Sequence, residues 1–176
     1  MTNVAFFRNL NLGHRGSPTS DELVAAFGGP TVARNFQTNG TVLFASAFPR
    51  ATADQARRAL RERGYQHHMV VRATSELGKI VTETPEAARE ENVYRTMISF
   101  FDTEHLPRVE LPARSRDQLV ELRRLGPGYV CSVCWKPRSK AGCVTGFLET
   151  LLNAPVTTRT LSTMRRLIAA EGPVAK

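Results

Sequence analysis

Long apolar runs, cysteine and aromatic residues are all scarce in this 176-residue sequence. Apolar stretches such as residues 42–45 are only a few residues long, whereas a bilayer-spanning helix needs about 20. The N-terminus lacks a basic segment followed by a long apolar one, so we expect neither a secretory signal nor a membrane anchor. Three cysteines are too few for a fold that depends on disulfide bonds, and their odd number favours a reducing, cytoplasmic location.

Acidic residues are fewer than basic ones. The chain has 16 Asp and Glu against 24 Lys and Arg, which gives a net charge of +8. Between Arg123 and Lys176 there are nine basic and two acidic residues, so this last third carries +7 of the excess. Such an excess suits an anionic partner, whether a nucleic acid, a nucleotide or a phosphorylated metabolite. A solvated basic face accounts for the same composition.

The first half of the chain predicts an α+β fold. Strands are expected at residues 4–7 and 68–73, and capping boxes at Thr19-x-x-Glu22 and Thr52-x-x-Gln55 predict two helices. Between the helices, Asn39-Gly40 suits a two-residue hairpin turn that pairs Gln37 with Val42. The resulting order is βαββαβ, the ferredoxin-like arrangement of an antiparallel sheet with two helices on one face.

The second half predicts a smaller α+β part. Strands are expected at residues 95–101 and 129–135, and basic helices around residues 147–152 and 161–168. A third capping box, Ser115-x-x-Gln118, predicts a helix carrying Leu119, Leu122 and Leu125. We therefore expect a ferredoxin-like subdomain at residues 1–84 and an α+β subdomain with basic helices at residues 85–176. A degenerate repeat of the first half would give similar elements, although no repeated sequence proves one.

Familiar catalytic, metal-binding and RNA-binding motifs are missing. The sequence contains no phosphate-binding loop, no His-Glu-x-x-His and no Gly-x-Ser-x-Gly. Cys131 and Cys134 fall at i and i+3 of an expected strand and so face opposite sides, and three thiols do not complete a four-ligand zinc site. The basic and aromatic signature of ferredoxin-like RNA-binding modules is also absent. We expect buried cysteines, no metal and no cofactor.

Cations and small hydroxyls remain as candidate ligand-binding groups. They gather at residues 138–140 and 157–163, and each stretch precedes an expected helix. Charged side chains, hydroxyls and helix N-terminal amides can together bind an anion at such a place. The same residues serve equally as helix caps beside solvated cations.

Four segments resemble those of a mainly bacterial family, domain of unknown function 1697. Residues 7–13 (FRNLNLG) resemble its LLRGINVGG opening, and residues 37–44 (QTNGTVLF) its QSGNVVF hairpin. Residues 138–140 (RSK) resemble its GRSK segment, and residues 157–163 (TTRTLST) its TTRNWNT segment, with Thr160 and Leu161 in place of Asn and Trp. The resemblance implies a ferredoxin-like α+β architecture and no settled activity.

Charge, placement and resemblance together point to seven candidate ligand-binding residues, namely Arg8, Asn11, His14, Ser139, Lys140, Thr158 and Arg159. We expect a soluble protein that binds a phosphate-containing ligand or nucleic acid through a basic surface. One alternative is an enzyme acting on a small phosphorylated or carboxylated substrate, with His14 as proton carrier. Another is a structural or protein-interaction module, in which these polar residues are caps and turns.

Overall fold

The computed structural model describes residues 2–87, 91–103 and 109–171, and its mixed helices and antiparallel sheets confirm the α+β class. The chain divides into two compact units, one made of Met1–Lys79 with Leu167–Lys176 and the other of Ile80–Arg166. Helices α3 (Thr74–Thr82) and α5 (Leu161–Ala169) therefore each begin in one unit and end in the other. The division into subdomains 1–84 and 85–176 stays a prediction.

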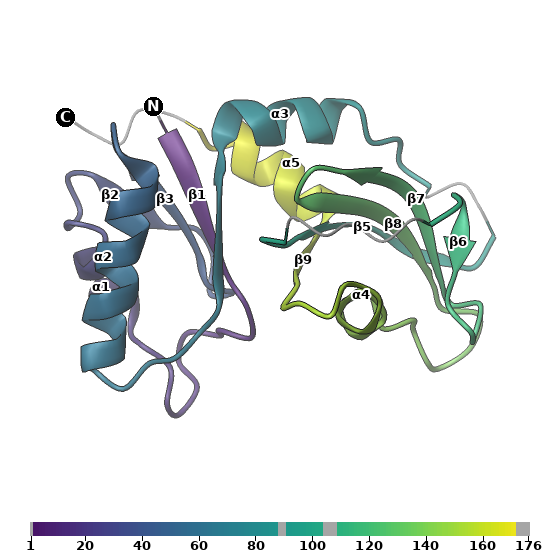
Figure 1. Cartoon of the computed structure of the whole chain (residues 1–176), viewed down its shortest axis with the longest axis horizontal. Helices are drawn as coiled ribbons and strands as arrows, with labels where there is room; N and C mark the ends of the chain where they lie inside the picture. The colour runs from purple at the N-terminus through teal and green to yellow at the C-terminus, as the bar shows by residue number, and fades with distance from the viewer. Residues whose placement is uncertain (1, 88–90, 104–108, 172–176) are drawn as a thin grey trace. The chain divides into compact units, whose positions relative to one another are not determined.

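The N-terminal unit has the predicted βαββαβ order (Figure 1). Its four strands form an antiparallel sheet in the order β2-β3-β1-β4. The elements are β1 (Thr2–Phe7), α1 (Ser20–Ala26), β2 (Ala33–Asn35), β3 (Thr41–Ala45), α2 (Pro49–Glu62) and β4 (Met69–Ala73).

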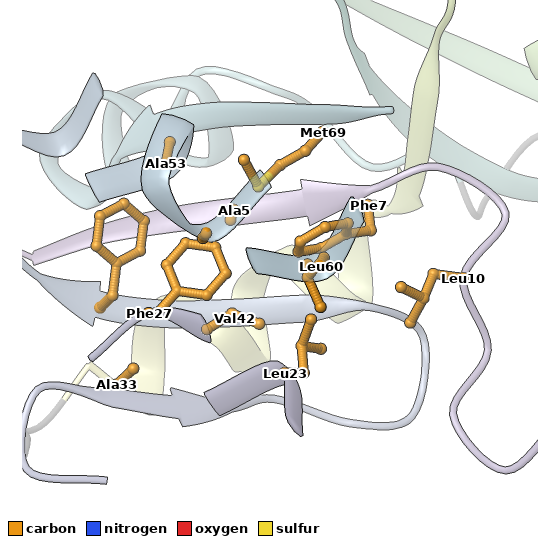
Figure 2. Close-up of a cluster of buried hydrophobic side chains, with 12 residues drawn as sticks. Ala5, Phe7, Leu10, Leu23, Phe27, Ala33, Val42, Ala53, Leu60 and Met69 are labelled. Atoms are coloured by element: carbon orange, nitrogen blue, oxygen red, sulfur yellow. The ribbon is translucent and has the colours of Figure 1, made fainter. Parts of the chain in front are cut away.

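Alternate side chains of the N-terminal sheet form one face of a hydrophobic core, and α1 and α2 cover that face (Figure 2). The ring of Phe27 lies 4.9 Å from that of Phe44 and 6.2 Å from that of Phe7, centroid to centroid. Each such buried aromatic side chain contributes about 2 kcal/mol of transfer free energy. The predicted capping box fixes the start of α1, because the backbone N–H of Glu22 donates to Thr19 Oγ1 at 3.2 Å and that of Thr19 to Glu22 Oε2 at 2.8 Å.

The hairpin between β2 and β3 differs from the predicted one. Asn35 pairs with Val42, so the connection is a four-residue loop at residues 37–40 rather than a two-residue turn. The last residue of β1 holds the loop, because the carbonyl of Gly40 accepts from the N–H of Phe7 at 2.8 Å. Gly40 has φ +64°, and a Cβ there would lie 2.9 Å from Cβ of Leu10. These tertiary contacts override the local preference of Asn39-Gly40 for a two-residue hairpin turn.

The start of α2 was also predicted wrongly. The helix begins at Pro49, three residues before the proposed cap Thr52, because proline is favoured in the first turn. The hydroxyl of Thr52 lies within the helix and bonds the hydroxyl of Ser46 at 2.8 Å.

The C-terminal unit is built on a five-stranded antiparallel sheet in the order β6-β7-β8-β5-β9. Helix α4 packs on one face of this sheet, where Leu148 and Leu152 join Phe101, Val130 and Val156 in a buried cluster (Figure 1). The elements are β5 (Val93–Phe100), β6 (Ala113–Arg114), β7 (Val120–Gly126), β8 (Tyr129–Trp135), α4 (Val144–Leu152) and β9 (Thr157–Thr160), followed by the start of α5.

The helix predicted after Ser115 is wrong, because that segment is a turn followed by β7. The hydroxyl of Ser115 accepts from the N–H of Val120 at 3.0 Å and donates to the carboxylate of Asp117 at 2.7 Å. Gln118 has φ +61°, which ends any helical path there. Serine and glutamine at this spacing thus close a tight turn instead of capping a helix. Strand β9, which the sequence analysis did not predict, follows α4.

The C-terminal sheet repeats the topology of the N-terminal one. The order β7-β8-β5-β9 corresponds to β2-β3-β1-β4, both in position along the chain and in pairing. Helices α4 and α5 correspond likewise to α2 and α3. Where the N-terminal unit has α1, the described residues between β5 and β7 contain the short strand β6 and no helix.

Register and backbone contacts support this internal repeat. Val4 pairs with Arg72 in the first unit, and Ile98 pairs with Arg159 at the equivalent place in the second. The carbonyls of Gly40 and Gly128 accept from Phe7 and Phe101 at 2.8 and 3.1 Å, and both glycines have positive φ. The order and pairing of the elements therefore repeat, although the two halves share little sequence similarity.

Candidate functional site

Three of the seven predicted residues lie in the N-terminal unit, in the loop between β1 and α1. Asn11 and His14 are exposed, and the N–H of His14 donates to the carbonyl of Asn11 at 3.3 Å. Arg8 is half-buried, and its N–H donates to the carbonyl of His68 at 2.8 Å. The loop thus offers two accessible polar side chains beside an arginine.

Ser139 and Lys140 lie in the C-terminal unit, in the loop that joins β8 to α4, and both are exposed. The pKa of the nearby Asp117 carboxyl is lowered, chiefly by the hydrogen bond from the Ser115 hydroxyl and that from the Leu119 N–H, and further by the charge of Lys140. Lys140 therefore lies near an acidic side chain.

Thr158 and Arg159 are neighbours on β9, and their side chains point to opposite faces of the sheet. On the α4 side, the Thr158 hydroxyl accepts from that of Thr145 at 2.8 Å and bonds that of Ser99 at 2.9 Å. Arg159 Nη1 donates to the carbonyl of Thr158 at 2.9 Å, and burial lowers the pKa of its guanidinium to about 10, so it stays charged at neutral pH. The structure does not bring these two side chains to one surface, and ligand binding by any of the seven residues stays a prediction.

A pocket of about 450 Å³ opens in the C-terminal unit, where the start of β5 meets the start of α5. Two arginines, Arg95 and Arg166, line it, and both are exposed. Glu86 also lines the pocket, but its carboxylate pairs with the guanidinium of Arg165. The remaining lining residues are Val93, Tyr94, Thr96, Thr160, Leu161, Ser162 and Thr163. The volume of this pocket is typical of ligand-binding sites. None of the seven predicted residues is among those that line it.

Three hydroxyls gather where α5 begins, at one side of the pocket. Thr160 Oγ1 accepts from the N–H of Thr163 at 3.1 Å and so caps the helix. The same hydroxyl donates to Thr163 Oγ1 at 2.9 Å and lies 3.0 Å from Ser162 Oγ.

The two repeats differ in charge at the position that lines the pocket. The residue of α3 equivalent to Thr163 is Glu76, whose carboxylate lies 3.8 Å from Nε of Arg72. In the second repeat a threonine hydroxyl stands in place of that carboxylate. A neutral donor at this position favours an anion, whereas a carboxylate repels one.

The pocket-lining arginines and Tyr94 were missed from the sequence. Arg95 and Arg166 lie 71 positions apart, and no sequence pattern indicates that β5 and α5 meet. Residues 157–163 were singled out as a cluster of hydroxyls and cations, but only Thr158 and Arg159 of this cluster were named as candidate ligand-binding residues. The β-branched residues at 156–158 were a signal for β9 that the analysis did not use.

Cys131 and Cys134 are buried on opposite faces of the sheet, as predicted, whereas Cys143 is exposed and that part of the prediction is wrong. Cys131 bonds the Thr84 hydroxyl at 3.2 Å on one face of the sheet, and Cys134 lies on the other, in the cluster beneath α4. Burial raises the pKa of both thiols. Among the described residues, no group of three His, Cys, Asp or Glu side chains is placed to hold a metal ion. No helix in the described ranges is long and apolar enough to cross a membrane.

Fold and pocket define an α+β protein with a repeated ferredoxin-like topology and an arginine- and hydroxyl-lined pocket in its second repeat. Residues 1–125 match the model of a family described as a protein of unknown function, DUF1697, and the chain belongs to that family. The match includes the N-terminal sheet and ends within β7, before the segments at 138–140 and 157–163. No curated protein and no solved structure matches the chain.

Proposed function

We propose that the protein binds a phosphate-containing ligand in the pocket between the start of β5 and the start of α5. The observation that carries this proposal is the lining itself, which combines two exposed arginines with three hydroxyls at a helix start. Guanidinium groups make charge-assisted, often bidentate hydrogen bonds to phosphate oxygens. The partial positive charge at the start of a helix adds to their attraction.

The charge of the pocket supports an anion over a cation. Among the described residues that line it, Arg95 and Arg166 are basic and Glu86 is acidic, and the Glu86 carboxylate pairs with the guanidinium of Arg165. Arg166 is one of the nine basic residues between Arg123 and Lys176, and the summed charge of this part of the chain attracts anions at longer range.

The size of the pocket supports a small ligand or one nucleotide unit. A volume of about 450 Å³ lies within the range of sites that bind cofactors and metabolites, and far exceeds what inorganic phosphate needs. Tyr94, which is 44% exposed, also lines the pocket and is an aromatic side chain on which a base could stack. The probes of choice are therefore inorganic phosphate and adenosine monophosphate.

Calorimetric titration of both probes into the protein, at low and at moderate salt, tests the proposal. We expect binding that weakens with salt, and an Arg166→Gln variant that binds about tenfold more weakly, since a charged hydrogen bond is worth about 1.5 to 3 kcal/mol. Arg61→Gln is the matched control, because Arg61 is an exposed arginine of α2 in the other unit. Equal affinities of the Arg166 and Arg61 variants, or no binding by the parent protein, would contradict the proposal.

A further inference from the structure

We infer that the pocket binds a phosphorylated segment of another protein, and that this segment pairs in extended conformation with the open edge of β5. The open edge consists of residues 93–96, which also line the pocket. The inference deepens the phosphate-binding function proposed above and rests on it, because the phosphate group of the segment would occupy the same pocket.

Strand β5 is paired unequally on its two sides. Towards β8 the pairing runs along the whole strand, from Val93 to Phe100. Towards β9 it begins only at Met97, which pairs with Thr160. Strand β9 ends there, because α5 begins at the next residue, Leu161. Among the described residues, no strand therefore pairs with the open edge of β5 on the side opposite β8.

An open strand edge presents backbone donors and acceptors to an extended chain. In an antiparallel sheet, alternate residues of a strand direct their N–H and C=O groups to the same neighbour. The open edge of β5 therefore directs some of these groups away from β8, on the side where β9 ends and α5 begins. Peptides that add a strand to a sheet use such an edge: main-chain hydrogen bonds provide affinity, and pockets beside the edge provide specificity.

The pocket beside this edge contains the groups that bind a phosphate. Arg95 belongs to the edge itself, Arg166 of α5 lines the same pocket, and both are exposed. The pocket lining also includes Ser162 and Thr163, at the start of the helix. A phosphoserine side chain carries a charge of about −1.5 to −2 and three acceptor oxygens, so one such side chain can bond both guanidinium groups.

A β-bulge determines how the side chains of the edge lie. The register of β5 against β8 shifts between Val93 and Arg95, and Tyr94 lies within this bulge. The guanidinium carbon of Arg95 lies 4.6 Å from the ring centroid of Tyr94, and Nζ of Lys136 lies 5.3 Å from it. Because the ring is neutral, these contacts orient the two cations without cancelling their charge. The edge therefore attracts an anionic peptide.

Charge and the open edge together favour a phosphorylated peptide over other partners. A second copy of the chain would bring Arg95 and Arg166 opposite a surface of the same charge, which is unfavourable. A nucleic acid strand supplies phosphates, but its backbone has no amide groups at the spacing of a β-strand. An unmodified peptide pairs with the edge but leaves the arginines without an anion.

Calorimetric titration of synthetic peptides into the full chain tests the inference. The main probe has about eight residues, with phosphoserine at its centre and valine and threonine on both sides to favour an extended conformation. The comparison ligands are the unphosphorylated peptide and free phosphoserine. We expect the phosphopeptide to bind at least about tenfold more tightly than either, since one lacks the charged hydrogen bonds and the other the backbone bonds.

N-methylation of the phosphopeptide provides a matched control for strand pairing. One peptide is methylated at one set of alternate backbone amides, and a second peptide at the other set. Only one set faces β5 in a paired strand, so we expect one methylated peptide to bind about tenfold more weakly and the other to keep its affinity. Both peptides carry the same phosphate group and the same number of methyl groups.

The protein itself gives two further readouts. Arg95→Gln should bind the phosphopeptide about tenfold more weakly, whereas Arg116→Gln should not, because Arg116 is an exposed arginine of the same unit outside the pocket. Hydrogen exchange should slow by at least about tenfold at one or more amides of the open edge when the phosphopeptide binds, and much less with free phosphoserine. An amide gains this protection by bonding to the added strand.

The outcomes separate this inference from the proposed function. A phosphopeptide that binds no more tightly than free phosphoserine, or an equal effect of the two methylation patterns, overturns pairing with β5 even if adenosine monophosphate still binds. Equal affinities of the phosphorylated and unphosphorylated peptides also overturn the inference, as does a deoxythymidine oligomer that binds more tightly than the phosphopeptide. Absence of both phosphate and adenosine monophosphate binding overturns the proposed function itself, and this inference with it.

Discussion

At the residue scale, the buried cysteines give a test of the described core. Cys131 and Cys134 are 4% and 3% exposed and burial raises the pKa of both thiols, whereas Cys143 is exposed. We expect iodoacetamide to modify Cys143 first, and Cys131 at least about a hundredfold more slowly, because it must await an opening that costs about 3 kcal/mol or more. Mass spectrometry of peptides over time measures both rates. Equal rates for Cys131 and Cys143 would mean that β8 is not buried as described.

Single residues show where sequence reasoning succeeds. Periodicity alone predicted that Cys131 and Cys134 face opposite sides of a strand, because that property depends only on backbone geometry. The same geometry separates Thr158 from Arg159, but the prediction placed them before a helix and did not assign a strand to them. Once β9 is known, the two side chains cannot share one face.

At the element scale, two glycines test the contrast between a constrained loop and an ordinary helix. A Cβ at Gly40 would meet Cβ atoms of Leu10 and Phe7 at 2.9 and 3.0 Å, and its φ is +64°. Gly40→Ala should therefore cost about 2 to 4 kcal/mol of unfolding free energy. Gly78 lies in α3 with open space around it, so Gly78→Ala should stabilise by about 0.5 to 1 kcal/mol. Urea unfolding measures both changes, and a neutral Gly40→Ala would refute the described packing of the loop.

The wrongly predicted helix at residues 115–125 has a physical explanation. Leucines at 119, 122 and 125 fall at a spacing of three, which resembles one face of a helix. A β-bulge between Leu122 and Arg124 shifts the register of β7 and breaks the alternation that would have indicated a strand. Pairing with β8 makes this segment a strand, and no local sequence pattern indicates that pairing. The capping box at Thr19, in contrast, acts within four residues and was confirmed.

At the scale of the whole molecule, the C-terminal residues belong to the N-terminal unit. Leu167 is 1% exposed, Arg34 donates to the carbonyl of Ala170, and the hydroxyl of Thr74 donates to Glu171. Ending the chain after Arg166 should therefore increase amide hydrogen exchange in β2 and β3, which are more than 100 positions away. A chain that ends after Glu171 is the control. Unchanged exchange in the shorter chain would contradict the assignment of these residues to that unit.

The repeated topology was accessible to sequence analysis only in part. The βαββαβ order of the first unit followed from apolar runs and turn signals, since each element there carries its own local pattern. The second unit keeps the pairing but replaces α1 by residues that include β6, and its β9 is short and rich in threonine. The pocket lies where β5, β9 and α5 of the second unit meet. It could therefore not be predicted before the pairing of these strands was known.

Nuclear magnetic resonance mapping of adenosine monophosphate onto backbone amides tests the central claim most directly. The account predicts saturable shifts for residues 160–163 and for Arg95, with smaller changes elsewhere, because the ligand would bind at the start of α5. The Arg61→Gln variant should show the same shifts, and Arg166→Gln should need about tenfold more ligand to reach them. Shifts confined to the loops holding His14 or Lys140, or no saturable shifts at all, would contradict the assignment of phosphate binding to this pocket.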